Sequence, residues 1–532
     1  MLAYVRFAVL GMAALGLFTA ATAARAEWWQ AETSHFIIIS ESDKADVENF
    51  ATRLERFDNA LRHLQRLPIP GPDVGPTNKV RVYRFGDPFE IGELATSGGG
   101  RGGIAGFYVP RAGASVAFVP TKSDDRMRFD RNLDRRQLIQ RTALSPEGTL
   151  FHEYVHHFML QRFNTTYPHW YVEGFAELYA TIELLDGGAF KVGVVPQHRG
   201  PDLERLGDVK LTKLLDHSKK LSGQETYQSY SFGWMLAHYL NFNKERQGQL
   251  AQYLKALNAG EDSLTAATRV FGDLDKLQSE LQKYKDGPFP GYEVIPAKYV
   301  APVVTMRRLT PGEEAVIKAH IRSERGVSRS QARSVVSSIE GKELAYPDDL
   351  AVQLIAAEAY ADARDFDKAE ATLKRALAIN PDSQKAHVLM GAAISARAEE
   401  EKNPALYATA RTWFQDAVRL DPKDPRAAIG LYMTYYEARE AIPESALLTL
   451  EGVFDSSSHD AGYRMILARQ LLDENRGKVA RSILAPLAFS AHKQEEANKV
   501  AKIVEEIDAE KIPEARTTMA AVFAEGKKDA EK

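Results

Sequence analysis

The chain has 532 residues, 44% of them hydrophobic and 26% charged, which is typical of a globular protein and excludes a disordered one. This length predicts two to four domains. The formal net charge of −4 gives no basic excess that would indicate a nucleic-acid partner, and the absence of cysteine excludes a disulfide framework and a thiolate zinc site.

Residues 1–26 have the pattern of a secretory signal peptide. Arg6 supplies a positive charge, residues 7–20 form an apolar run, and Ala-Arg-Ala at 24–26 is a small-residue cleavage site. We therefore expect a periplasmic or secreted bacterial protein that begins near Glu27 and has no membrane span after signal removal. An uncleaved N-terminal anchor is the alternative, although the apolar run is short for a span.

The residues that follow, 27–286, mix strand and helix patterns and are predicted to form one α+β domain. Residues 43–67 have the apolar spacing of an amphipathic helix. His35, a residue of the first expected strand, is assigned a structural role. The expected strands in this part are residues 34–39, 80–85, 107–109, 114–119 and 190–195.

His152, Glu153 and His156 form an HExxH motif in a segment predicted to be helical. The serine, proline and glutamate at 145–147 favour a helix start directly before it. On a helix, residues four apart share a face, so the two histidines can direct their imidazoles at one metal ion. Glu153 lies beside them, where it can hold a water molecule.

A second motif, Trp-Tyr-Val-Glu-Gly-Phe-Ala-Glu at 170–177, follows on the next predicted helix. Glu173 adds a carboxylate to the two histidines, which leaves a fourth position open, as a catalytic zinc requires. Glu177, one turn further, is placed to accept the free N–H of a ligating histidine. Helix geometry alone leaves Glu177 open as an alternative to Glu173 as the third ligand. Gly174 would allow close approach of this helix to a neighbour.

Together, HEYVH at 152–156 and WYVEGFAELYA at 170–180 resemble the motifs of gluzincin metallopeptidases, and more closely those of their bacterial peptidase-MA-like branch. The resemblance covers roughly residues 28–250 and implies a zincin-like fold with one Zn²⁺ ion. The zinc ligands that it implies are His152, His156 and Glu173. It also implies that Glu153 is the general base in hydrolysis of a peptide or protein substrate.

The same resemblance implies two further features. Gluzincins commonly place a tyrosine or histidine where it donates a hydrogen bond to the carbonyl oxygen on which charge develops. Tyr227 or Tyr230 matches this role, and the alternative is that both only pack. Zincins also pair an extended substrate with an edge strand beside the zinc helix, and residues 114–119 are our candidate. His198, in a turn after an expected strand at 190–195, is assigned to a surface loop, and the alternative is a place at the rim of the cleft.

The pattern changes in the second half of the chain. Residues 287–345 are predicted to be a linker or crossing segment, because 287–310 is punctuated by proline and glycine. Residues 346–505 form helix pairs with a period of about 34 residues, and they resemble tetratricopeptide-repeat proteins, with an insertion near 399–404. The remaining residues, 506–532, are predicted to be a charged tail that frays.

These patterns predict an exported zinc metallopeptidase whose repeat domain recruits a substrate or a protein partner on its concave surface. One alternative is a repeat-based binding protein in which the metallopeptidase fold is weak or regulated. Another is a zinc hydrolase that acts on a non-peptide amide. A solenoid with a purely structural role is the third alternative for the repeats.

Overall fold

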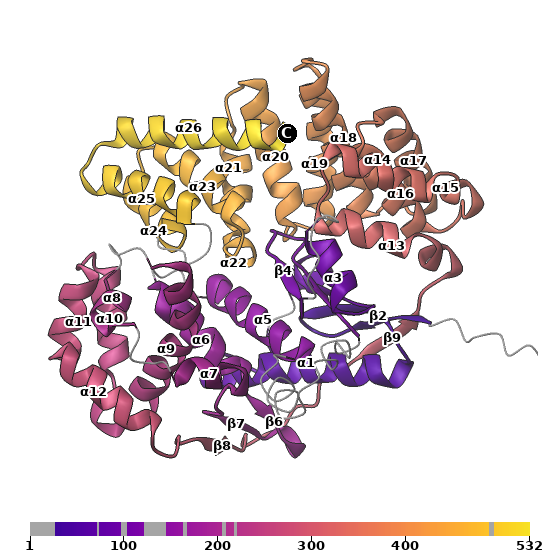
Figure 1. Ribbon diagram of the computed structural model, residues 1–532. Coiled ribbons are helices and arrows are strands. Elements are labelled where there is room, and N and C mark those ends of the chain that lie inside the picture. Colours follow the sequence, from indigo (N-terminus) through magenta and orange to yellow (C-terminus); the bar gives the residue numbers. More distant parts are fainter. Residues whose placement is uncertain are drawn as a thin grey trace, which may run out of the picture.

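The computed structural model describes residues 27–71, 74–96, 104–121, 145–162, 167–204, 209–216, 221–488 and 494–531. The predicted signal peptide, residues 1–26, lies outside the described residues. A mixed α/β N-terminal region is followed by a helical C-terminal region, and the helices of the second part arch over the first (Figure 1). This arrangement confirms the predicted order of an α/β part and a helical part.

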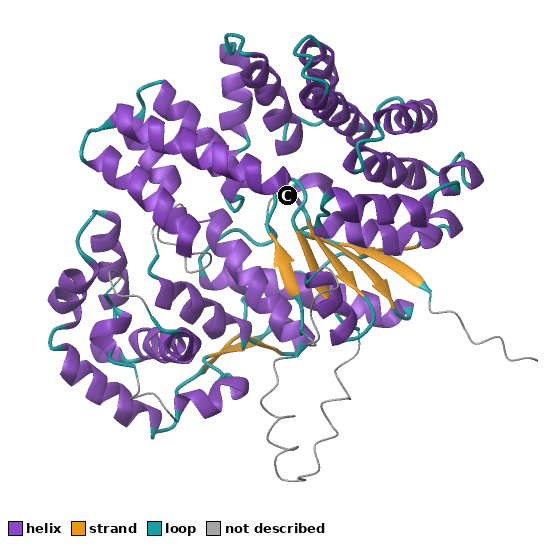
Figure 2. Ribbon diagram, turned by 45° about the horizontal axis from the view of Figure 1, so that its top comes forward, coloured by secondary structure: helices purple, strands orange, loops and turns teal. Residues whose placement is uncertain are grey.

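A six-stranded mixed sheet forms the centre of the N-terminal region (Figure 2). Its strand order is β4-β5-β3-β2-β1-β9, in which β2, β3 and β5 are parallel and the other pairs are antiparallel. The strands are β1 (Trp28–Glu32), β2 (Phe36–Glu41), β3 (Val80–Arg84), β4 (Phe107–Val109), β5 (Val116–Val119) and β9 (Thr305–Arg308). Four of the five strands expected from the sequence lie in this sheet, as β2, β3, β4 and β5, and the fifth, expected at 190–195, is β7 (Phe190–Val192) of a second sheet.

Helices cover both faces of this sheet, which explains why β2 is a continuous apolar run. Phe36 and Ile38 pack with α1 and α5, whereas Ile37 and Ile39 point to the opposite face and pack with α3 and α13. The covering helices are α1 (Lys44–Leu64), α3 (Pro88–Ala95), α5 (Pro146–Arg162) and α13 (Pro311–Arg325). Helix α1 confirms the predicted amphipathic helix.

A second group of helices packs beside α5 and completes the N-terminal region. Its central members are α6 (His169–Ala180) and α9 (Gly223–Phe242), and a small sheet of order β6-β7-β8 lies at its edge. The remaining elements are α2 (Gly75–Asn78), β6 (Glu183–Leu184), η2 (Asp186–Gly188), β7 (Phe190–Val192), η3 (Gln197–Arg199), α7 (Gly200–Leu203), α8 (Leu211–Leu214), η4 (Lys244–Arg246), α10 (Gln249–Asn258), α11 (Ser263–Phe271), α12 (Leu274–Lys285) and β8 (Tyr292–Val294).

His238 on α9 makes this region sensitive to acid. Its buried ring contacts the Tyr284 hydroxyl at 2.9 Å and donates from Nε2 to the Gly193 carbonyl at 3.3 Å. Burial lowers the pKa of His238 to about 4, from an ordinary value of 6.5. The unfolded chain therefore binds the proton more readily, and this contribution to stability is complete above pH 6.5 and is lost as the pH falls toward 4.

We expect His238 to remove about 2 kcal/mol of unfolding free energy between pH 7 and pH 5, as calculated from the two pKa values. Urea denaturation at both pH values measures this difference. The His238→Asn variant has no titrating ring, so its stability should fall by about 2 kcal/mol less than that of the wild type over the same range. An equal fall in both proteins would contradict the assignment.

The C-terminal region is built from antiparallel helix pairs, as the sequence predicts. The pairs that match predicted repeats are α16 with α17, α18 with α19, α20 with α21, and α23 with α24. Phe414 of α19 packs against Gly391 and Gly430, where a methyl group would collide with its ring. The helices are α14 (Arg329–Ile339), α15 (Lys342–Ala345), α16 (Leu350–Asp362), α17 (Phe366–Ile379), α18 (Gln384–Glu400), α19 (Leu406–Leu420), α20 (Pro425–Ala438), α21 (Glu444–Gly452), α22 (Phe454–Ser457), α23 (Ala461–Asp473), α24 (Gly477–Ala488), α25 (Gln494–Asp508) and α26 (Ile512–Glu531).

Two segments differ from their predictions. Residues 287–345 do cross between the two regions, but they are largely packed structure and not a linker: β8 pairs with β7, β9 pairs with β1, and α13 covers the sheet. Residues 506–532 were predicted to fray, yet they contain α26, whose Ala515 and Met519 are buried in the core of the repeats. Their spacing of four residues places both side chains on one helical face, which the charged composition obscured.

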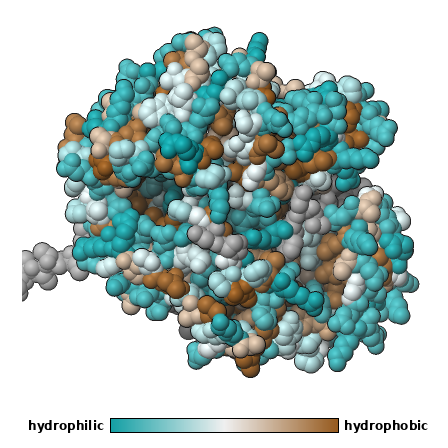
Figure 3. Space-filling model, turned by 180° about the vertical axis from the view of Figure 1, so that it is seen from behind, coloured by the Kyte–Doolittle hydropathy of each residue, from teal (hydrophilic) through white to brown (hydrophobic). Residues whose placement is uncertain are grey.

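The surface is largely hydrophilic in the view from behind, and hydrophobic residues form several separate groups on it (Figure 3). Among the described residues, no helix is long and apolar enough to cross a membrane.

Candidate metal centre

The helix that carries the HExxH motif is held at its start by local and tertiary contacts. Ser145 caps α5 by accepting a hydrogen bond from the Gly148 amide at 3.0 Å, and Pro146 is the first helical residue, as predicted. Glu147 accepts two hydrogen bonds from Arg53 of α1, at 2.6 and 2.9 Å. These contacts orient the first turn of α5 against α1.

The second motif lies on α6, which crosses α9 at two glycines. A Cβ atom on Gly174 would lie 2.3 Å from the Gly233 carbonyl oxygen, and one on Gly233 would lie 2.3 Å from the Trp170 carbonyl oxygen. Both distances are far below van der Waals contact, so only glycine allows the two backbones this approach. The predicted role of Gly174 is confirmed, and the crossing sets the depth at which its neighbour Glu173 enters the site.

We expect Gly174→Ala to lower the free energy of unfolding by about 1–3 kcal/mol, because overpacking outweighs the better helix propensity of alanine. Urea denaturation of the full chain measures the loss. Gly223→Ala is a matched control at the start of α9, where no atom lies within 4 Å of the new methyl group. Equal stability of the Gly174→Ala variant and the control would contradict a tight crossing.

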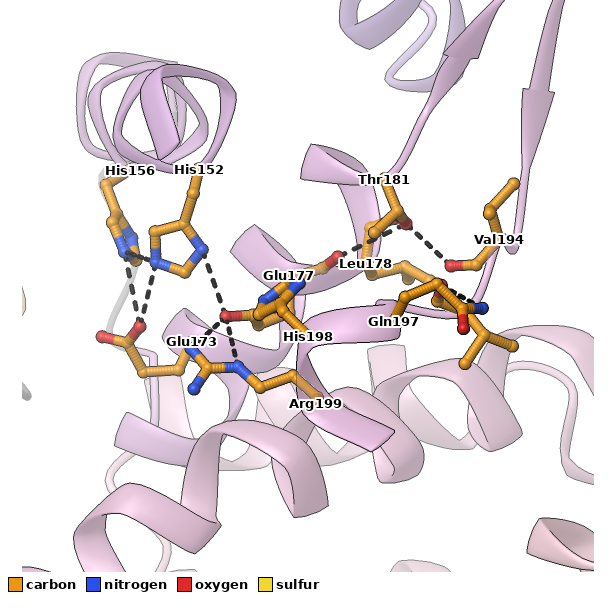
Figure 4. A network of polar contacts seen from close by, with 11 residues as sticks. His152, His156, Glu173, Glu177, Leu178, Thr181, Val194, Gln197, His198 and Arg199 are labelled. Atoms are coloured by element: carbon orange, nitrogen blue, oxygen red, sulfur yellow. Dashed lines mark hydrogen bonds and ion pairs between the residues drawn. The ribbon is translucent and has the colours of Figure 1, made fainter. Parts of the chain in front are cut away.

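Three predicted ligands converge between α5 and α6 (Figure 4). The Nε2 atoms of His152 and His156 lie 3.1 Å apart, and Glu173 Oε2 lies 3.4 Å from the first and 3.5 Å from the second. Both histidines are buried, and Glu173 has an exposed fraction of 0%. The helical spacing thus aims both rings at one point, and α6 adds the carboxylate.

The chemistry of this donor set fits a zinc ion. Two imidazole nitrogens and one carboxylate oxygen are common ligands of catalytic Zn²⁺. A cation at this point would also balance the charge of the fully buried Glu173, which is costly to bury alone. Burial by itself would lower the pKa of His152, but the adjacent carboxylates, first among them Glu173, raise it above its ordinary value. The site therefore favours positive charge.

A second cluster of a histidine and carboxylates in the same region differs from the metal centre in what balances its negative charge. His35 Nδ1 lies 2.7 Å from Glu55 Oε1 and 3.4 Å from Asp58 Oδ2. Here the buried guanidinium of Arg62 pairs with Asp58 and lies 3.0 Å from His35 Nε2. The chain itself supplies the balancing cation, which agrees with the structural role predicted for His35.

Glu177 lies on the other side of His152 from Glu173. Its Oε1 atom is 3.5 Å from His152 Nδ1, whereas Glu173 faces Nε2. Glu177 also accepts hydrogen bonds from His198 at 2.9 Å and from Arg199 at 2.6 and 3.0 Å. Burial alone would raise its pKa, but the hydrogen bond from His198 and the charges of His152 and Arg199 lower it to about 2. Glu177 is therefore a carboxylate held beside a ligand histidine.

This support for Glu177 is not predicted from the sequence. His198 is predicted in a surface loop or at the rim of the cleft, and no role is predicted for Arg199, but η3 brings both side chains against α6. The only signal in the sequence was a basic pair in a turn after a strand. Nothing local indicated that this turn folds back onto the second motif.

The structure places two of the three predicted catalytic residues near the cluster. Glu153 is half-buried on α5, between the two histidines in sequence. The Tyr230 ring on α9 lies 6.5 Å from the His152 ring, and the Arg199 guanidinium lies 4.9 Å over its face. Burial, then the charge of Glu173, raises the pKa of Tyr230 well above its ordinary value. The side chain of Tyr227 lies outside the described part of the structure.

The predicted substrate strand, 114–119, is wrong. Its residues form β5, which has β3 on one side and β4 on the other and has no free edge for a third strand. The edge strand at this end of the sheet is β4, Phe107–Val109, which is half-buried and contacts α5. The hairpin was predicted, but local alternation does not reveal which of its strands becomes the edge.

Comparison with known families matches one part of the chain. The tetratricopeptide repeat family model matches residues 350–394, which contain α16, α17 and the start of α18. This confirms the repeats predicted there, and such repeats commonly bind proteins or peptides. No curated protein gives a significant match to the chain.

Proposed function

We propose that this chain is an exported zinc-dependent metallopeptidase of the gluzincin type, with a zincin-like N-terminal domain. One observation carries the proposal: His152, His156 and Glu173, from two different helices, bring three ligating atoms within 4.8 Å of one another. Export rests on the signal pattern of residues 1–26, and the peptidase type rests on the two sequence motifs.

Zn²⁺ bound by these three residues would supply a Lewis acid and lower the pKa of a coordinated water. Glu153 would accept the proton of the attacking water and later deliver it to the leaving amine nitrogen. Tyr230 keeps its phenolic proton at neutral pH, because its pKa is raised. It is our candidate to donate a hydrogen bond to the carbonyl oxygen as negative charge develops there.

The edge strand β4 is the candidate to hold an extended substrate. It is one of the two outermost strands of the six-stranded sheet and contacts α5, and among the described residues no strand pairs with its outer edge. A peptide that pairs with this edge would run past the HExxH helix, and main-chain hydrogen bonds would hold its backbone.

The tetratricopeptide match favours a second candidate function, a protein-binding scaffold. In that case residues 350–394 and the neighbouring repeats recruit a partner, and the metal site is weak or regulated. One digestion experiment separates the candidates. The purified protein, loaded with zinc, is incubated with a peptide library, with and without a chelator, and new termini are identified by mass spectrometry.

Chelator-sensitive cleavage would support the peptidase. No cleavage by protein shown to contain zinc would overturn it, and would favour the scaffold or hydrolysis of a non-peptide amide.

A further inference from the structure

The repeats contact the metal helix directly. The connection from α22 to α23, residues 458–460, and the first turn of α23 lie against the C-terminal half of α5 and against the β4–β5 hairpin. These residues are buried at the contact, with Ser458, His459 and Arg464 all inaccessible to solvent or nearly so. The contact lies one to five residues past His156 along α5, so it is continuous with the candidate metal centre.

Ser458 and Arg464 occupy the carbonyl end of α5. The last carbonyl groups of a helix lack partners within it. Ser458 Oγ donates to the carbonyls of Leu160 and Gln161, each at 3.2 Å, and Arg464 Nη2 donates to Leu160 at 3.3 Å. Burial lowers the pKa of Arg464 to about 10, so at neutral pH it remains a cation, which is favourable at the negative end of a helix dipole.

His459 ties the same helix to the hairpin. Its ring lies 4.5 Å from the His157 ring, at a steep angle. Its Nε2 lies 2.9 Å from Ser115 Oγ and 3.2 Å from the Arg111 carbonyl, to which it can only donate. Ser115 in turn accepts from Tyr108, whose hydroxyl is also 2.7 Å from His157 Nδ1.

The neighbouring residue completes the junction. Asp460 accepts a hydrogen bond from the Ala112 amide at 2.7 Å with one oxygen, and with the other it caps α23 through the Tyr463 amide at 3.0 Å. One short connection in the repeats therefore binds the metal helix and the strand hairpin together, and it does so through directed hydrogen bonds and not through apolar packing alone.

We propose that Ser458 and His459 are positioning residues of the metal centre, and that the repeat region holds α5, and with it His152 and His156, in the arrangement that binds metal. This inference rests on the proposed function, because it assumes that His152 and His156 bind zinc. It makes the repeats a working part of the site, in addition to the recruitment of a substrate or partner expected from the sequence.

The test uses the full chain and three alanine variants: Ser458→Ala, His459→Ala and, as the matched control, His387→Ala. His387 is also a buried histidine of the repeats, but it bonds to the Ser383 carbonyl of its own segment and faces Trp413. The first readout is hydrogen exchange of the amides of α5 without added metal. The second is Co²⁺ titration, followed by the visible absorption of the bound ion.

We expect Ser458→Ala and His459→Ala to speed exchange at residues 157–162 by about 10-fold or more, because that end of α5 opens locally. Co²⁺ affinity should fall about 10–100-fold, as it does when residues that support metal ligands are lost. His387→Ala should change neither. His459→Gln, which keeps a donor for Ser115 and Arg111, should recover most of the Co²⁺ affinity and of the wild-type spectrum.

Two results would overturn the positioning role: unchanged exchange and unchanged Co²⁺ affinity in both variants, or the same changes in His387→Ala, which would indicate general destabilisation. A wild-type protein that binds neither Co²⁺ nor Zn²⁺ would overturn the proposed function instead. In that case hydrogen exchange alone tests the contact. Faster exchange of the α5 amides in His459→Ala, but not in His387→Ala, would show that the contact stabilises this helix, and equal exchange in the two variants would refute it.

Discussion

Glu153→Gln is expected to abolish peptide hydrolysis and to leave the zinc content and the fold unchanged. Glutamine has nearly the shape of glutamate but cannot accept a proton from water. Loss of a general base lowers the rate by about 10²–10⁴-fold. Glu153 is turned about 100° from His152 around α5, so it need not bind the metal itself. The rate is measured on a peptide that the wild type cleaves in the library digest.

Glu147→Gln is a matched control for this change. It is the same substitution on the same helix, but Glu147 lies in the first turn and pairs with Arg53 of α1, away from the ligands. It should keep wild-type turnover. Unchanged turnover in Glu153→Gln would show that the activity does not use this chemistry, and loss of zinc in that variant would show that Glu153 has a structural role.

His156→Ala and Glu173→Ala are each expected to remove the single zinc ion that the wild type carries. Each variant deletes one of three ligating atoms that lie within 4.8 Å of one another in a buried site. Glu177→Ala should be milder and weaken affinity by about 10–100-fold, because Glu177 supports the Nδ1 side of His152. Native mass spectrometry gives the stoichiometry, and competition with a chromophoric chelator gives the affinity.

His63→Ala is the control for loss of a histidine, because His63 is exposed on α1 and its ring faces Phe190 and not the ligand cluster. It should retain the full zinc content. Equal zinc in the wild type and in His156→Ala would contradict the metal centre. If Glu177→Ala strips zinc as completely as Glu173→Ala does, the roles of the two glutamates are reversed.

The sequence by itself determined those features that depend on neighbours a few residues apart. The helical period places His152 and His156 on one face, Ser145 and Pro146 begin α5, and apolar runs and alternation identify β2, β3, β4 and β5 of the six-stranded sheet. The repeat pattern identified the helix pairs, one of which lies within the family match at 350–394. These predictions succeeded because hydrophobic periodicity and capping act locally.

Only the tertiary structure decided how these pieces face one another. The crossing at Gly174 and Gly233 brings Glu173 to Nε2 of both histidines, and a turn 22 residues after Glu177 brings Arg199 to it. Strand pairing made β4 the edge and added β9 to the sheet. Composition suggested a linker and a tail where α13 and α26 are packed helices. The physical reason is that long-range contacts depend on the complementarity of whole surfaces, whereas the patterns in a sequence record only which face of each element is buried.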